Sequence, residues 1–134
     1  MASADVADYT FCATVYDPEQ GRNACRRLAD AFGSGRDPRA TEIRQAMAAA
    51  MDAFPGLQNF VAAMDERNLN PEDAMMDVSR VQAEHAGPVV GAAAKLALIG
   101  AMAEVAGRFD WDDVVDCAGF CQEAFAQSDL AKVH

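Results

Sequence analysis

Apolar residues in this chain recur at spacings of three and four, the spacing of one face of an α-helix. In the stretch PGLQNFVAAMDERN, the apolar residues at i, i+3, i+4 and i+7 are Leu57, Phe60, Val61 and Met64. A second arc begins at Trp111 and comprises Val114, Val115, Cys117, Ala118, Phe120, Cys121, Ala124 and Phe125. These patterns predict a short helix after Pro55 and a longer amphipathic helix over about residues 110–127.

Proline marks the start of three more helices. Aspartate and asparagine are favoured at the N-cap of a helix, and proline is favoured in its first turn. This pair of residues occurs three times, at Asp17-Pro18, Asp37-Pro38 and Asn70-Pro71. The three helices are expected to end at Gly33, before Pro55 and at Gly87-Pro88.

The stretch from Pro88 to Gly107 has no polar face at all. Its two charged residues, Lys95 and Glu104, are nine positions apart, which is about 180° around a helix. Two charges also interrupt it as a membrane span, and alanine and glycine dominate it. We therefore predict a buried central helix over 88–107, whose small residues let neighbouring helices pack closely. For Lys95 we expect a stem that reaches the surface or a carboxylate partner, in preference to a desolvated amine.

These elements define an all-α fold, a compact single domain spanning residues 1–134 with about six helices around the central one. The length of 134 residues fits one domain, and only 7% of the residues are aromatic. Residues 9–16 fit both a strand and a helix. We favour a helix there, because a lone strand would have no partner.

Charge narrows the function. The chain has 11 basic and 21 acidic residues, a net charge of −10, which argues against direct binding to nucleic-acid phosphates. Residues 22–44 contain six arginines and three carboxylates, whereas residues 45–134 contain five basic and fourteen acidic side chains. This layout suits docking on a basic partner, or pairing of unlike patches in a homodimer. The alternative explanation is that the negative charge serves solubility alone.

The N-terminus predicts a protein of the cytoplasm. MASADVADYTFCATVY lacks a basic region followed by a continuous apolar run, so no signal peptide is expected. The four cysteines show no framework spacing, which is typical of free thiols in a reducing compartment. Neither a signal sequence nor a membrane attachment is predicted.

Two cysteines of the last predicted helix admit two interpretations. Cys117 and Cys121 face inward, and a disulfide between them is disfavoured because Cβ atoms four residues apart in a helix lie about 5–6 Å apart. Packing as small apolar residues is the favoured interpretation. The alternative is a thiolate site for Cu(I) or Zn, with further ligands from Cys25 or His85, which is expected on the inner stripe of its helix.

The segment FDWDDVVD is the strongest candidate for a binding surface. Asp110 is expected to cap the last helix, and Trp111 among carboxylates resembles an aromatic anchor with a charged rim. The candidate partner-binding residues here are Trp111, Asp110, Asp112, Asp113 and Asp116. Acidic residues around the turn before residue 78 would extend the surface: Asp65, Glu66, Glu72, Asp73 and Asp77.

No nucleophile elbow, zinc-protease motif, phosphate loop or calcium loop occurs in the chain, so no enzymatic activity and no cofactor are expected. The predicted function is an acidic protein-interaction module, an adaptor or inhibitor that docks on a basic partner protein, with nucleic-acid-binding proteins among the candidates. A phage-type inhibitor or an immunity protein would fit this description. A thiolate metal-binding protein and a structural homodimer are the two alternatives.

Overall fold

A computed structural model describes residues 16–35 and 37–133, and within these ranges it gives no side-chain placement for residues 71, 72, 74–76 and 128–133. The described chain forms six helices and no strand. They are α2 (Pro18–Gly33), α3 (Ala40–Ala53), α4 (Leu57–Glu66), α5 (Pro71–Ala86), α6 (Pro88–Val105) and α7 (Trp111–Val133). The all-α prediction is confirmed; the prediction for residues 9–15 lies outside the described ranges.

Helix starts follow the predicted caps at two places. The Asp17 carboxylate accepts hydrogen bonds from the backbone N–H groups of Glu19 and Gln20, at 3.0 and 3.4 Å. The Asp110 carboxylate accepts one from the N–H of Asp112 at 2.9 Å. Each side chain satisfies donors that the first helical turn leaves without an intrahelical partner.

The predicted start of α3 at Asp37-Pro38 is wrong. The helix begins at Ala40, and its N-cap residue, Arg39, is extended and makes no side-chain cap hydrogen bond. Pro38 is buried and lines a groove together with Ile43, so its ring packs against the bundle instead of opening a helical turn. Asp37-Pro38 has the same two residue types as Asp17-Pro18, but the packing of Pro38 against the bundle differs from the environment of Pro18.

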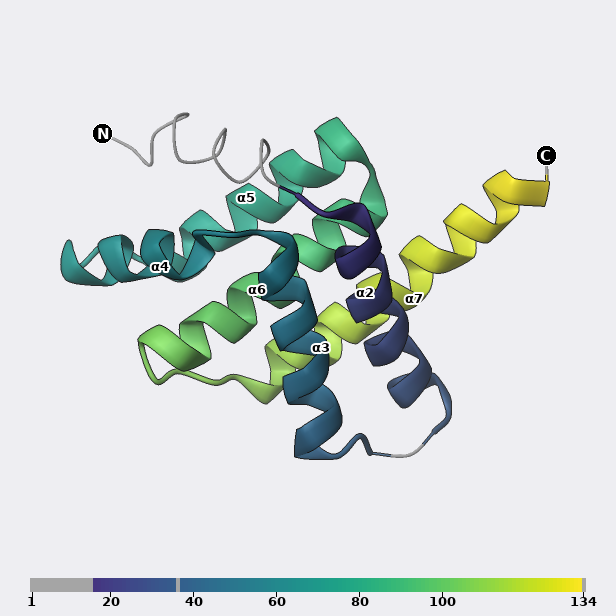
Figure 1. Ribbon diagram of the computed structural model, residues 1–134, viewed down its shortest axis with the longest axis horizontal. Coiled ribbons are helices and arrows are strands. Elements are labelled where there is room, and N and C mark those ends of the chain that lie inside the picture. Colours follow the sequence, from purple (N-terminus) through teal and green to yellow (C-terminus); the bar gives the residue numbers. More distant parts are fainter. Residues whose placement is uncertain (1–15, 36, 134) are drawn as a thin grey trace.

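Helix α6 is the centre of the bundle, as the absence of a polar face predicted. It packs on α2, α3, α4, α5 and α7, and Figure 1 shows it in the middle of the molecule behind the α2–α3 pair. Its length and composition would suit a membrane span, but 67% of the apolar stretch is buried inside the protein. That is the environment of the core helix of a soluble protein.

Small residues on α6 let the neighbouring helices approach closely. A Cβ atom placed on Gly91 would lie 2.6 Å from the Cβ of Ala83 on α5, and one on Gly100 would lie 3.0 Å from the Cβ of Met47 on α3. Carbon atoms in contact normally stay about 3.5–4.0 Å apart. Glycine is therefore required at Gly91 for the observed packing of α5 on α6.

Candidate functional site

Exposed apolar side chains gather around the start of α7. Among the side chains that the structure describes, five large apolar ones are exposed, and four of these lie within residues 109–120. They are Phe109, Trp111, Val115 and Phe120, with exposed fractions of 51%, 42%, 42% and 52%. Scattered exposed apolar residues are ordinary, but such a concentration is typical of an interaction surface.

Two of these residues should be inside according to the helical wheel. Val115 and Phe120 fall within the predicted inward arc, but both are exposed, so this part of the prediction is wrong. The reason is that α7 packs mainly on α2 and α6, which cover a narrower sector of the helix than the apolar arc occupies. The core positions of α7 are Val114, Cys117, Ala118, Cys121 and Ala124.

Phe109 and Trp111 lie at the edge of an apolar groove between α3 and α6. The ring of Trp111 lies 6.2 Å from that of Phe109 and 6.1 Å from that of Phe32 on α2, measured between ring centroids. The groove has a volume of about 690 Å³, and Ile43, Met47, Met51 and Gly100 are among its lining residues. We call this the Trp111 groove. Flexible methionine side chains allow such a groove to adapt to an apolar anchor from a partner.

The predicted carboxylates of α7 do not all face the same way. Asp112 and Asp116, one helical turn apart, are exposed on the outer face of α7, whereas Asp113 is partly buried. Asp110 is exposed while it caps the helix. The lining of the Trp111 groove itself carries both signs, with Arg44 from α3 and Glu104 from α6. The acidic part of the surface is therefore the outer face of the first two turns of α7.

The second predicted acidic group lies elsewhere on the molecule. Asp65 and Glu66 end α4, and Asp73 and Asp77 lie on the first two turns of α5, all four exposed. Asp77 is paired with Arg80 at 3.7 Å. In Figure 1 the α4–α5 turn lies at the left-hand end of the bundle, well separated from the start of α7, so the ten predicted residues do not form one continuous surface. The Glu72 side chain lies outside the described part.

Three buried cysteines meet between α2 and α7. Cys25, Cys117 and Cys121 are free thiols with no exposed surface. The thiols of Cys25 and Cys117 donate to the carbonyl oxygens of Val89 and Ala92 on α6, at 3.8 and 3.6 Å. Hydrogen bonds with Cys117 and Cys25, together with burial, raise the pKa of Cys121 far above that of a free thiol. A thiol in this environment stays protonated and unreactive.

The metal-binding alternative gains no preformed site from this arrangement. Within residues 16–35 and 37–133, no group of three or more histidine, cysteine, aspartate or glutamate side chains is arranged to hold a metal ion. His85 is exposed on the last turn of α5, so its predicted place on the inner stripe is wrong. Val78 and Gln82 are buried instead. The buried face of α5 therefore includes the polar Gln82 and leaves out His85.

The arginine-rich segment 22–44 forms part of the surface of α2 and α3. Arg26, Arg27, Arg39 and Arg44 are exposed, and the guanidinium of Arg26 lies 5.8 Å from the centre of the Phe125 ring on α7. Comparison with protein-family models, with curated proteins and with solved structures finds no match to this chain. Its function is therefore argued from its own surface.

Proposed function

We propose that this protein is a non-enzymatic interaction module that docks on a basic partner protein through the start of α7. The observation that carries the proposal is the exposed Phe109–Trp111 pair at the edge of the Trp111 groove, next to the outward carboxylates of Asp112 and Asp116. An aromatic residue beside an apolar groove, flanked by charge, has the features of an interface hot spot.

In this proposal the two parts of the surface act differently. The Trp111 groove receives an apolar anchor of the partner and supplies most of the affinity. Asp110, Asp112 and Asp116 face lysine or arginine side chains of the partner, which raises the association rate and selects against acidic proteins. An adaptor or inhibitor that covers a basic surface would act in this way.

The compartment is part of the proposal. The three described cysteines are unpaired thiols buried in the core, which suits a reducing cytoplasm. The net charge of −10 keeps the protein away from phosphate backbones and membranes of the same sign.

The test compares matched bait proteins in lysate of the source organism. Wild-type protein is expected to retain a basic protein, and Trp111→Ala and the pair Asp112→Lys/Asp116→Lys are expected to lose it. The control is Asp65→Lys/Glu66→Lys, which makes the same change of charge on the α4–α5 side and should retain the partner.

Affinity measurements with the purified partner then test each part. Loss of an aromatic anchor costs about 2 kcal/mol or more, so Trp111→Ala should weaken binding about thirtyfold or more. Binding should also weaken as salt is raised. A partner whose affinity is unchanged by the α7 substitutions and insensitive to salt would contradict the proposal. Recovery of only a second copy of this chain would favour the homodimer instead.

A further inference from the structure

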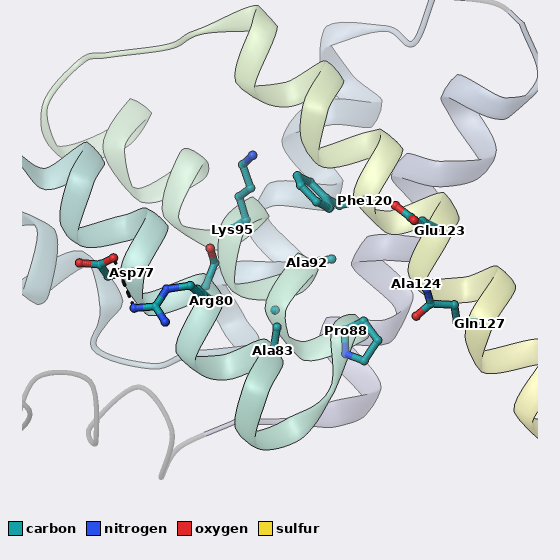
Figure 2. Close-up of a pocket in the computed structure, with 12 residues that line it drawn as sticks. Asp77, Arg80, Ala83, Pro88, Ala92, Lys95, Phe120, Glu123, Ala124 and Gln127 are labelled. Atoms are coloured by element: carbon teal, nitrogen blue, oxygen red, sulfur yellow. Dashed lines mark ion pairs between the residues drawn. The ribbon is translucent and has the colours of Figure 1, made fainter.

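A second groove lies on the other flank of α7, between α7 and α5, with α6 as its floor (Figure 2). Its volume is about 560 Å³, and half of its lining residues are small or apolar: Ala83, Pro88, Gly91, Ala92, Phe120 and Ala124. The other half are polar or charged: Asp77, Ser79, Arg80, Lys95, Glu123 and Gln127. We call it the Lys95 groove. It exists because α5 and α7 both pack on α6 but not extensively on each other. Pockets for small molecules have volumes of about 300–1,000 Å³ and mostly apolar linings.

Lys95, one of the two charged residues of α6, supplies a cation to this groove. Its side chain is partly exposed, and its ammonium nitrogen lies 4.7 Å from the centre of the Phe120 ring. In Figure 2 these two side chains lie at one end of the groove and Pro88 lies at the other. An ammonium over an aromatic ring is attracted to the ring face but keeps its own positive charge.

The other charges of the Lys95 groove are arranged differently. Arg80 on α5 already pairs with Asp77 at 3.7 Å and with Glu84 at 3.2 Å. Lys95 makes no ion pair with a carboxylate among the residues that the structure describes. Glu123 lines the α7 wall, opposite Arg80 on α5, and its carboxylate and that of Asp77 carry the same sign as an anionic ligand. Within the described part of the chain, Lys95 and Glu123 are therefore the two charged lining residues without an ion pair, and Figure 2 shows Lys95 beside Phe120, whereas Glu123 lies farther along α7.

We propose that the Lys95 groove binds a small, soluble amphiphilic anion, with an apolar body of one or two rings and a single carboxylate. The apolar body packs on the floor of Gly91 and Ala92 and against the exposed Phe120 ring. The carboxylate pairs with the Lys95 ammonium, which complements its charge. The Lys95 groove and the Trp111 groove have no lining residue in common. The proposed ligand is an anion, whereas the proposed protein partner is basic. The proposal for the Lys95 groove therefore does not depend on the proposed function.

The probe is 1-naphthoate, with 1-naphthalenemethanol as its neutral analogue. Binding to the full-length protein is measured by calorimetry and by amide chemical shifts in NMR spectra. At about 0.3 kcal/mol per heavy atom, naphthoate should bind with a Kd on the order of 1 mM or tighter. The largest shifts should come from the amides around Lys95 and Phe120.

Four substitutions test the site. Lys95→Met keeps the apolar stem and removes the charge, so naphthoate should bind about tenfold more weakly. Phe120→Ala should also weaken binding, and Glu123→Gln should strengthen it by removing a like charge from the α7 wall. The matched control is Arg27→Met, which removes the same charge from the exposed face of α2, outside both grooves, and should leave the Kd unchanged. Unaltered circular dichroism shows that each variant is folded.

Three results would overturn the proposal. One is equal affinity for the acid and the neutral alcohol, which would remove the role of Lys95. Another is equal weakening by Lys95→Met and Arg27→Met, which would show that only the total charge of the protein matters. The third is an absence of binding at several millimolar naphthoate. None of these results would affect the test with the basic partner, because that test relies on Trp111 and the α7 carboxylates.

Discussion

The packing of α5 on α6 predicts that one substitution has opposite effects at two glycines. Gly119 lies on the outer face of α7, and a Cβ atom placed there would meet no atom within 4 Å. At Gly91 the same atom would lie 2.6 Å from the Cβ of Ala83 and 3.0 Å from the carbonyl oxygen of Ser79. Gly119→Ala should therefore stabilise the protein and Gly91→Ala should destabilise it.

The sizes of the two effects follow from one shared gain and one local cost. Alanine in a helix interior is more favourable than glycine by about 1 kcal/mol, and both variants receive this gain. Only Gly91→Ala must also separate two packed helices, since the new contact is about 1 Å shorter than carbon atoms allow. Overpacking of this kind costs about 1–3 kcal/mol, and so short a contact belongs at the upper end. The free energies of unfolding of the two variants should thus differ by about 3 kcal/mol.

Urea unfolding followed by circular dichroism measures this difference, provided that both variants keep the wild-type dependence on urea concentration. Gly100→Ala serves as an intermediate case, because its Cβ would lie 3.0 Å from the Cβ of Met47, a longer contact than at Gly91, so α3 and α6 need to separate by less. The expected order of stability is Gly119→Ala, wild type, Gly100→Ala, Gly91→Ala. Equal stability of Gly91→Ala and Gly119→Ala would refute the close approach of α5 to α6.

Three further predictions follow from local contacts. Asp17→Ala should lower the free energy of unfolding by about 1 kcal/mol, because it removes the side-chain cap of α2. Asp37→Ala should leave it unchanged, because α3 has no side-chain cap. Equal decreases in the free energy of unfolding, measured with urea, would contradict this prediction. In native protein, Cys25, Cys117 and Cys121 should not react with a thiol reagent, and all four cysteines of the chain should react after unfolding. Stoichiometric copper or zinc in protein purified without chelator would instead support the metal-binding alternative. Burial, and then the neighbouring Cys25, raises the pKa of Tyr16 from 10.0 to about 12. The neutral phenol therefore contributes its full stabilisation below pH 10, and this contribution is lost as the pH rises from 10 to 12. Tyr16→Phe should remove this part of the pH dependence of the free energy of unfolding, and an unchanged dependence would contradict the prediction.

Sequence patterns predicted those parts of the fold that depend on one helix at a time. The burial of α6 followed from the placement of Lys95 and Glu104 on opposite sides of an apolar helix. The inward position of Cys117 and Cys121 followed from the wheel of α7. The caps at Asp17 and Asp110 followed from residue type and position. In each case the determining interaction is local or depends only on which face is apolar.

The residues whose burial was predicted wrongly depend on contacts with other helices, which the pattern within one helix does not reveal. A helical wheel gives the direction of Phe120 but not the width of the sector that α2 and α6 cover. The same limit applies to His85, because the burial of Gln82 could not be expected from its polarity. The Lys95 groove arises from two helices that share α6 without packing on each other, and the meeting of Cys25 with Cys121 joins segments 96 residues apart in the chain. Contacts of this kind form between helices that are distant in the chain, so they could not be predicted from the pattern within each helix.

The position of α6 in the chain also affects how the protein is made. Synthesis proceeds from the N-terminus, so α2 to α5 leave the ribosome before the helix on which all four of them pack. Until Val105 has emerged, the apolar faces of α4 and α5 have almost no other surface to cover them. The nascent chain therefore exposes the apolar faces of α4 and α5 until α6 has emerged. Exposed carboxylates on these two helices help to keep the chain soluble during that interval: Asp65, Glu66, Asp73, Asp77 and Glu84.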